Sequence, residues 1–238
     1  MVTHSVKVRE AYTRIKLALL RYGVPPGTAI NITSVAEKMR ISQTPVREAL
    51  IWLLSEELID FIPNRGYYAK HLSFGDLKAE YEVAYMISKY SIETGEVAFD
   101  ETAGEDQCGQ PGLSVVVDDN GADCVAGYLE RLYRRVSMTS GNNKLIRAMS
   151  SFNERTGFIR RYGLKNDPEF IGFLSGMEGL ETCLLSGNRK KALSLLEHHH
   201  GAKVAILQRV LHKLRRDVDA AAESFEDLLG RLARKPDH

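Results

Sequence analysis

Apolar residues recur at helical spacing along most of the 238-residue chain. One such stripe, in the first twenty residues, consists of Val8, Tyr12, Ile15 and Leu19, and it predicts an amphipathic helix. Similar stripes predict helices over 33–39, 45–53, 76–98, 122–136, 145–161, 168–185, 189–213 and 217–232. The acidic, glycine-rich segment 100–123 indicates a loop around a short apolar element at 113–117. The pattern therefore predicts a mainly α protein.

Two β-prone runs, IDFI and YYA, interrupt the helical pattern between residues 59 and 69. They flank the turn PNRG, in which Asn64 and Gly66 tolerate a positive φ, so the two runs predict a hairpin. The order within the first seventy residues is then helix, helix, short turn, helix and hairpin, which is that of a winged helix-turn-helix. We expect this domain to cover residues 1–72, and an all-α antiparallel helical bundle to cover residues 73–238.

The second and third helices begin with residues that can satisfy free backbone N–H groups. Thr33 or Ser34 is expected to cap the second helix, and Thr44 is expected to cap the third, with Pro45 as its first residue. The apolar residues of the third helix start only at Val46. A recognition helix in the major groove needs this arrangement, because its first residues reach the base edges while its body packs on the domain.

The polar side chains at the start of the third helix suit DNA. Arg47 can donate two hydrogen bonds to guanine, and the amide of Gln43 can pair with adenine. Ser42 and Thr44 can hold phosphates. These four residues predict a recognition helix.

The hairpin tip and the distribution of charge agree with a polyanionic partner. Arg65, beside Gly66, could enter the neighbouring minor groove. Up to residue 70 there are ten Lys and Arg against six Asp and Glu, whereas residues 71–125 have two against twelve. We therefore expect nucleic acid to meet the first seventy residues.

The stretch VAEKMRISQTPVREALIWLLSEELIDFIPNRGYYA resembles the DNA-binding domain of GntR-type bacterial transcriptional regulators over about residues 28–69. The resemblance implies a homodimer on a palindromic, double-stranded operator and a C-terminal domain that senses a small-molecule effector. The family usually has arginine where this chain has Gln43, so a common guanine contact is missing. The expected DNA-binding residues are Thr33, Ser34, Ser42, Gln43, Thr44, Arg47, Asn64, Arg65 and Gly66.

The helical remainder resembles the FCD-type effector domain of the FadR-like subgroup, in its length and in SGNNKLIRAM and LSGNRKKALSLLEHH. Many members of this subgroup hold a divalent metal with one Asp and three His. When the motifs are set in register, those four positions fall on Leu129, Tyr133, Glu178 and His199. Only His199 is a typical ligand among them and Leu129 cannot ligate at all, so we expect no metal and no other cofactor.

The altered metal site is expected to be an effector pocket formed by Tyr133, Glu178 and His199, with Leu129 as an apolar wall. Buried polar groups of this kind bind one another, water or a ligand. Glu178 and His199 could pair directly, or the three residues could bind a neutral or amine-bearing effector. A neutral or amine-bearing effector agrees with Ala84, because the family has at this position an arginine that often binds the carboxylate of the ligand. The alternative is a dimeric DNA-binding regulator with a degenerate pocket and no ligand.

Other classes of protein find less support in the sequence. The histidines at 198–200 point about 100° apart around a helix and match neither HExxH nor HxxxH. We therefore expect that the protein is not an enzyme. No apolar run approaches the roughly 18 residues of a membrane span. Cys108, Cys124 and Cys183 have no CxxC spacing, which favours structural thiols in a reducing compartment. The sequence thus predicts a cytoplasmic transcriptional regulator, a repressor, whose operator affinity an effector controls.

Overall fold

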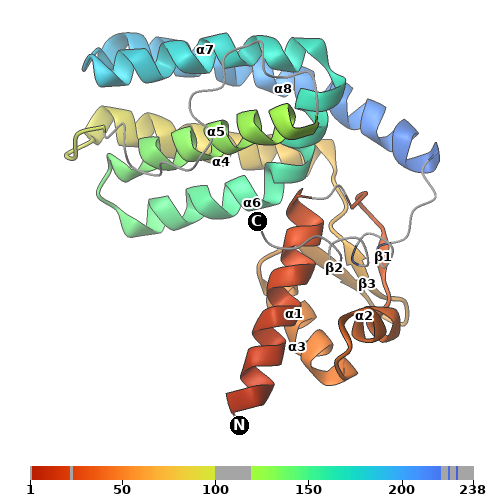
Figure 1. The fold of residues 1–238 in the computed structure, drawn as a ribbon. Helices are drawn as coiled ribbons and strands as arrows, with labels where there is room; N and C mark the ends of the chain where they lie inside the picture. Colours follow the sequence, from red (N-terminus) through yellow and green to blue (C-terminus); the bar gives the residue numbers. More distant parts are fainter. Residues whose placement is uncertain (1, 22–23, 100–118, 221–224, 226–228, 230–238) are drawn as a thin grey trace. The chain divides into compact units, whose positions relative to one another are not determined.

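The computed structural model describes residues 2–21, 24–99, 119–220, 225 and 229 (Figure 1). The chain divides into two compact units. One unit consists of Met1–Leu72 with Arg215–His238, and the other is Ser73–Leu214. The second domain expected from the sequence, 73–238, is therefore too long at its C-terminal end. The apolar element expected at 113–117 lies outside the described residues.

The N-terminal unit is a winged helix-turn-helix. Its elements are α1 (Val2–Arg21), β1 (Ala29–Ile30), α2 (Ile32–Met39), α3 (Gln43–Ser55), β2 (Ile59–Ile62) and β3 (Gly66–Ala69). The three strands form one antiparallel sheet in the order β1-β3-β2. The two-residue strand β1 was not predicted, because two residues are too few to show an alternating pattern.

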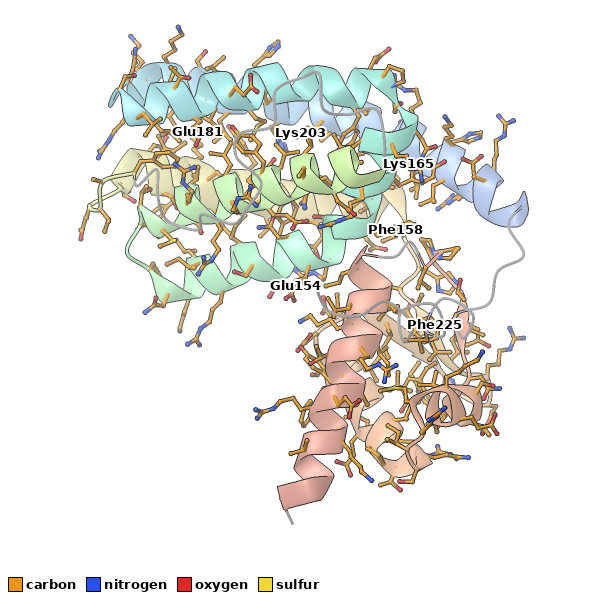
Figure 2. The ribbon with its side chains drawn as sticks, viewed as in Figure 1. Glu154, Phe158, Lys165, Glu181, Lys203 and Phe225 are labelled. Carbon is orange, nitrogen blue, oxygen red and sulfur yellow. The ribbon has the colours of Figure 1, made fainter. Side chains whose placement is uncertain are left out.

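The apolar stripes of α1 and α3 form the core of this unit. Ile15 from α1 and Leu50 and Leu53 from α3 are completely buried in it. Phe225 and Leu229, near the end of the chain, belong to the same core, and Figure 2 labels Phe225 there. The N-terminal domain is therefore completed by residues that the sequence pattern assigned to the helical bundle.

The second unit is helical throughout its described residues. Its helices are α4 (Phe74–Thr94), α5 (Asp119–Met138), α6 (Asn143–Asn166), α7 (Pro168–Leu185) and α8 (Arg189–Ala220), of which α8 ends in the first unit. The prediction that a separate helix starts at residue 217 is wrong, because α8 continues without a break to Ala220. The prediction of a mainly α protein with an N-terminal winged helix-turn-helix is confirmed.

Two ionic contacts, of which only the one at Glu181 is buried on both sides, join the helices of the second unit. Glu181 of α7 accepts a hydrogen bond from Tyr128 of α5 at 2.6 Å and pairs with Arg135, also of α5. Asp167 caps the start of α7 and binds Arg209 of α8 at 2.8 Å. Each carboxylate therefore fixes a neighbouring helix at a defined position.

The cysteines only partly follow the expectation of structural thiols. Cys183 is a free thiol buried in α7. Cys124 is disulfide-bonded, so the expectation is wrong at this position, and Cys108 lies outside the described residues. Within the described part of the chain, no helix is both long enough and apolar enough to cross a membrane.

Candidate nucleic-acid interface and ligand cavity

Helix α2 is capped by Asn31 rather than by Thr33 or Ser34. Asn31 has an extended backbone, with φ −85° and ψ 112°, and its Oδ1 accepts from the backbone N–H groups of Thr33 at 3.0 Å and Ser34 at 3.1 Å. The predicted caps Thr33 and Ser34 are thus inside the helix, two and three residues after the true cap. The exposed hydroxyl of Thr33 is left to bind another group.

Helix α3 begins two residues earlier than predicted. Ser42 occupies the cap position, with φ −74° and ψ 164°, and its side chain makes no capping hydrogen bond. Thr44, the predicted cap, and Pro45, the predicted first residue, are the second and third residues of the helix. A helix start without a side-chain cap keeps its first N–H groups available for an anion such as phosphate.

The exposed tip of α3 makes one hydrogen bond to α2 and one within α3. Gln43 Nε2 donates to Thr33 Oγ1 at 3.1 Å, and Arg47 Nη2 donates to Gln43 Oε1 at 3.4 Å. Ser42 and Thr44 are exposed beside them, whereas Val46 is completely buried. Gln43 therefore orients Arg47, and the polar end and the packed body of α3 are separated as predicted.

The wing is a tight hairpin in which Ile62 pairs with Gly66. The backbone N–H of Arg65 donates to Ile62 O at 3.0 Å, and the side chain of Arg65 is exposed. Asn64 and Gly66 have φ of 64° and 101°, the positive values that the sequence PNRG suggested. The turn therefore presents Arg65 at the tip of the wing.

A small cavity lies inside the helical unit, among five helices. It has a volume of about 20 Å³, which is close to the size of one water molecule. Its lining residues are Tyr81, Leu129, Tyr133, Arg160, Phe170, Met177, Lys203 and Leu207. We call it the Lys203 cavity; Figure 2 labels Lys203.

The polar lining of the Lys203 cavity consists of two cations and two phenols. Lys203 Nζ contacts Tyr133 Oη and lies 3.6 Å from Met177 Sδ. Arg160 donates to Glu130 Oε1 and to Thr156 Oγ1, both at 2.8 Å. Burial, together with the nearby charge of Arg160, lowers the pKa of Lys203 to about 7.

The two phenols remain protonated under ordinary conditions. Burial raises the pKa of Tyr81 and that of Tyr133 to about 12, although the charge of Arg160 acts in the opposite direction on both. Each hydroxyl can therefore donate a hydrogen bond to a group in the cavity at neutral pH.

Comparison with known families agrees with the winged helix-turn-helix geometry. Residues 7–68 match the sequence model described as bacterial regulatory proteins, gntR family. The chain carries a GntR-family DNA-binding domain. The match spans most of α1, the helix-turn-helix and most of the wing, so it includes each predicted DNA-binding residue. The helical unit lies outside it, and the FadR-like subgroup thus remains a prediction.

A curated relative extends the similarity beyond the GntR domain. The chain is 25% identical over 143 residues to the Nta operon transcriptional regulator of Aminobacter aminovorans. That alignment covers 58% of this chain and 66% of the relative, slightly under two thirds of its length. The matched relative is a transcriptional regulator rather than an enzyme.

Two solved structures share the fold of most of the chain. One is a putative GntR transcriptional regulator from Rhodococcus sp. RHA1, with a TM-score of 0.67, 16% identity, and coverage of 86% of this chain and 98% of that chain. The other is McbR/YncC of E. coli, with a TM-score of 0.59, 17% identity, and coverage of 85% and 97%. The combination of a GntR domain with a helical C-terminal unit thus occurs in known structures.

The residues predicted for the effector pocket of this GntR-domain protein do not all meet at the cavity. Tyr133 and the apolar Leu129 line it, but Glu178 and His199 are not among its lining residues. His199 is buried against Gly176 of α7, where a Cβ atom would collide with the imidazole ring. The lysine one turn later on α8 extends further than a histidine does, and its amine occupies the cavity instead.

Sequence reasoning missed Tyr81, Arg160 and Lys203. Lys203 did leave a signal, because it falls on the same face of α8 as the buried residues Leu196, Leu207 and Leu214. Within the described residues, no group of three or more His, Cys, Asp or Glu side chains is arranged to hold a metal ion.

Proposed function

We propose that the protein is a homodimeric transcriptional repressor that binds a specific double-stranded operator. The observation that carries this proposal is the exposed end of α3, where Thr33, Gln43 and Arg47 form one hydrogen-bonded row. Side chains held in this way lose little conformational freedom when they meet DNA, which favours selective base contacts.

The other expected contacts support the same docking. The uncapped start of α3 can bind a phosphate through its N–H groups, with the hydroxyls of Ser42 and Thr44 beside it. Arg65 at the tip of the wing can reach a second groove while the body of α3 packs on α1. Together they give base contacts from α3 and positioning contacts from the wing.

The proposal assigns the control of DNA binding to the helical unit, as in the FadR-like subgroup. A small-molecule effector would act by binding one arrangement of the two domains more tightly than the other. The two cations and two phenols in the lining of the Lys203 cavity favour this proposal over a degenerate pocket, and the cavity has room for a group of about the size of one water molecule. No catalytic role is proposed, and the place of action is the cytoplasm, where operator DNA lies.

An exposed apolar stripe on α4 supports the homodimer. Val83, Met86 and Tyr90 are 49%, 61% and 52% exposed and are spaced three and four residues apart, so they lie on one face of the helix. We assign this stripe to the contact between two copies, because a palindromic operator requires two recognition helices at a fixed separation.

Selection of operators from random DNA, followed by affinity measurements on variants, tests the proposed function. Arg47→Ala should lose about 1–3 kcal/mol of discrimination at one base pair in each half-site. Arg65→Ala should weaken binding with little change in sequence preference. Arg134→Ala, which removes an exposed arginine from the helical unit, is the control and should behave as the wild type. Undiminished selectivity of Arg47→Ala would show that α3 is not the recognition helix.

A further inference from the structure

The ammonium group of Lys203 lines the Lys203 cavity, and no carboxylate of the described residues contacts it. Its polar contacts are the hydroxyl of Tyr133 and the sulfur of Met177, and both of these residues are buried. Neither partner carries a negative charge. A buried ammonium ordinarily pairs with an anion, because removing it from water is costly.

The carboxylate that pairs with the second cation at the cavity, Arg160, is not a partner for Lys203. Arg160 is 1% exposed and already binds Glu130, and the same carboxylate accepts from Arg161 at 2.9 Å. Glu130 thus serves two arginines and is not among the residues that line the cavity. The charge of Arg160 instead adds to that of Lys203.

The polar groups that line the cavity are suited to an acceptor. Lysine and arginine can only donate hydrogen bonds, and the hydroxyls of Tyr81 and Tyr133 can donate as well. The other lining residues, Leu129, Phe170, Met177 and Leu207, offer no strong donor or acceptor. A neutral or amine-bearing guest, which the sequence suggested, would place an uncharged or a third cationic group beside two cations.

We propose that the Lys203 cavity binds a compact monovalent anion, held by Lys203 and Tyr133. The size of the cavity limits the guest, because about 20 Å³ accommodates a group about as large as one water molecule. A halide ion and the carboxylate end of a larger effector share this charge and this compactness. The inference goes beyond control of DNA binding and does not depend on it.

Access to the cavity is available along the side chain that would hold the anion. Lys203 as a whole residue is only half-buried, although its amine contacts buried groups. Its aliphatic part therefore lies between the solvent and the cavity. Met177, an adaptable side chain, forms another part of the wall, so a larger carboxylic acid could displace it.

Thermal unfolding of the full-length protein in different sodium salts at one ionic strength tests the proposal. Chloride, bromide and formate should raise the Tm above its value in gluconate, because a ligand that binds only the folded state stabilises it. If formate alone acts, the natural guest is the carboxylate of an effector; if the halides act as well, the site accepts a free ion. Equal Tm values in all of these salts would overturn the proposal.

Two variants assign the effect to the cavity. Lys203→Met should weaken the apparent Kd for bromide by about tenfold or more, while its Tm in gluconate should equal or exceed that of the wild type. Lys190→Met removes an exposed lysine from the same helix and should retain the wild-type response. A full bromide response in Lys203→Met would place the anion elsewhere.

A milder variant and a direct measurement cover the possibility that Lys203→Met fails to fold. Tyr133→Phe removes one donor and should weaken bromide binding by roughly two- to tenfold. Anomalous scattering from a bromide-soaked crystal should show a peak beside Lys203 Nζ, and the lack of one would contradict the proposal. Operator affinity, measured separately, reports on the proposed function and can fail or succeed independently.

Discussion

Gln43 is the residue at which the predicted recognition surface departs from the usual GntR pattern. In the structure its amide both donates to Thr33 and accepts from Arg47. An arginine at this position cannot accept a hydrogen bond, so it could not orient Arg47 in the same way. The glutamine therefore helps to determine the position of Arg47.

Gln43→Arg should shift the operator preference toward guanine at one position of each half-site, because arginine donates two hydrogen bonds to guanine. It should also weaken the preference at the base contacted by Arg47, since the two cations would repel each other across one helical turn. Selection from random DNA with wild type and variant measures both changes. An identical profile would show that Gln43 faces away from the bases.

Lys203 should make stability depend on pH. Its pKa is about 7 in the folded protein against an ordinary value of 10.5, so between these pH values the unfolded chain binds more protons. The free energy of unfolding of the wild type should therefore rise with pH across this range. The gain in Tm from Lys203→Met, measured in gluconate, should be larger below pH 7 than above pH 10.

The groups around Lys203 do not reproduce this pH dependence. Tyr81 and Tyr133 titrate near pH 12, above this range. Burial and the charge of Lys203 lower the pKa of His199 from its ordinary value of 6.5, so His199 titrates below the range. A gain in Tm that is the same at both pH values would show that Lys203 is not the titrating group.

At the scale of elements, the sequence predicted which segments are helices better than where they begin. Strong apolar stripes identify the helices, because burial of one face sets a 3.6-residue period. The caps are harder to assign, since Asn31, Thr33 and Ser34 are all good capping residues and lie within four positions. Backbone conformation, which the sequence does not reveal, selects Asn31.

Stability measurements test both the observed cap of α2, Asn31, and the cap predicted for α3, Thr44. Asn31→Ala should lower the free energy of unfolding by about 1 kcal/mol, because it removes the acceptor for two N–H groups of α2. Thr44→Ala should change it by less than about 0.5 kcal/mol, as expected for an exposed side chain that caps no helix. Denaturant unfolding of the two variants makes the comparison, and a larger loss in Thr44→Ala would restore the cap predicted from the sequence.

The cavity could be predicted only in part, for a physical reason. Tyr81, Tyr133, Arg160 and Lys203 come from four helices separated by long stretches of sequence, and no local spacing relates them. Tyr133 was predicted through the family register alone. The proposed DNA-binding surface, by contrast, lies within one short continuous segment, so local patterns were enough to propose its residues.

At the scale of the whole molecule, two copies should associate through the α4 stripe of Val83, Met86 and Tyr90. Met86→Glu should convert a dimer into a monomer at micromolar concentration, because it places a charge in the centre of an apolar contact. Lys78→Glu introduces the same charge elsewhere on α4 and should leave the dimer intact. Sedimentation of the two variants decides, and a dimeric Met86→Glu protein would exclude this face.

The burial of Phe225 and Leu229 in the core of the N-terminal unit has a consequence for synthesis. A ribosome makes α3 early, but it adds these two side chains only after the helices α4 to α8 of the second unit have been translated. Burying a large apolar side chain contributes about 1.5–3 kcal/mol, so the N-terminal domain of a nascent chain lacks part of its final stability. A product that ends before Phe225 would therefore have a less stable N-terminal domain and should compete poorly for an operator.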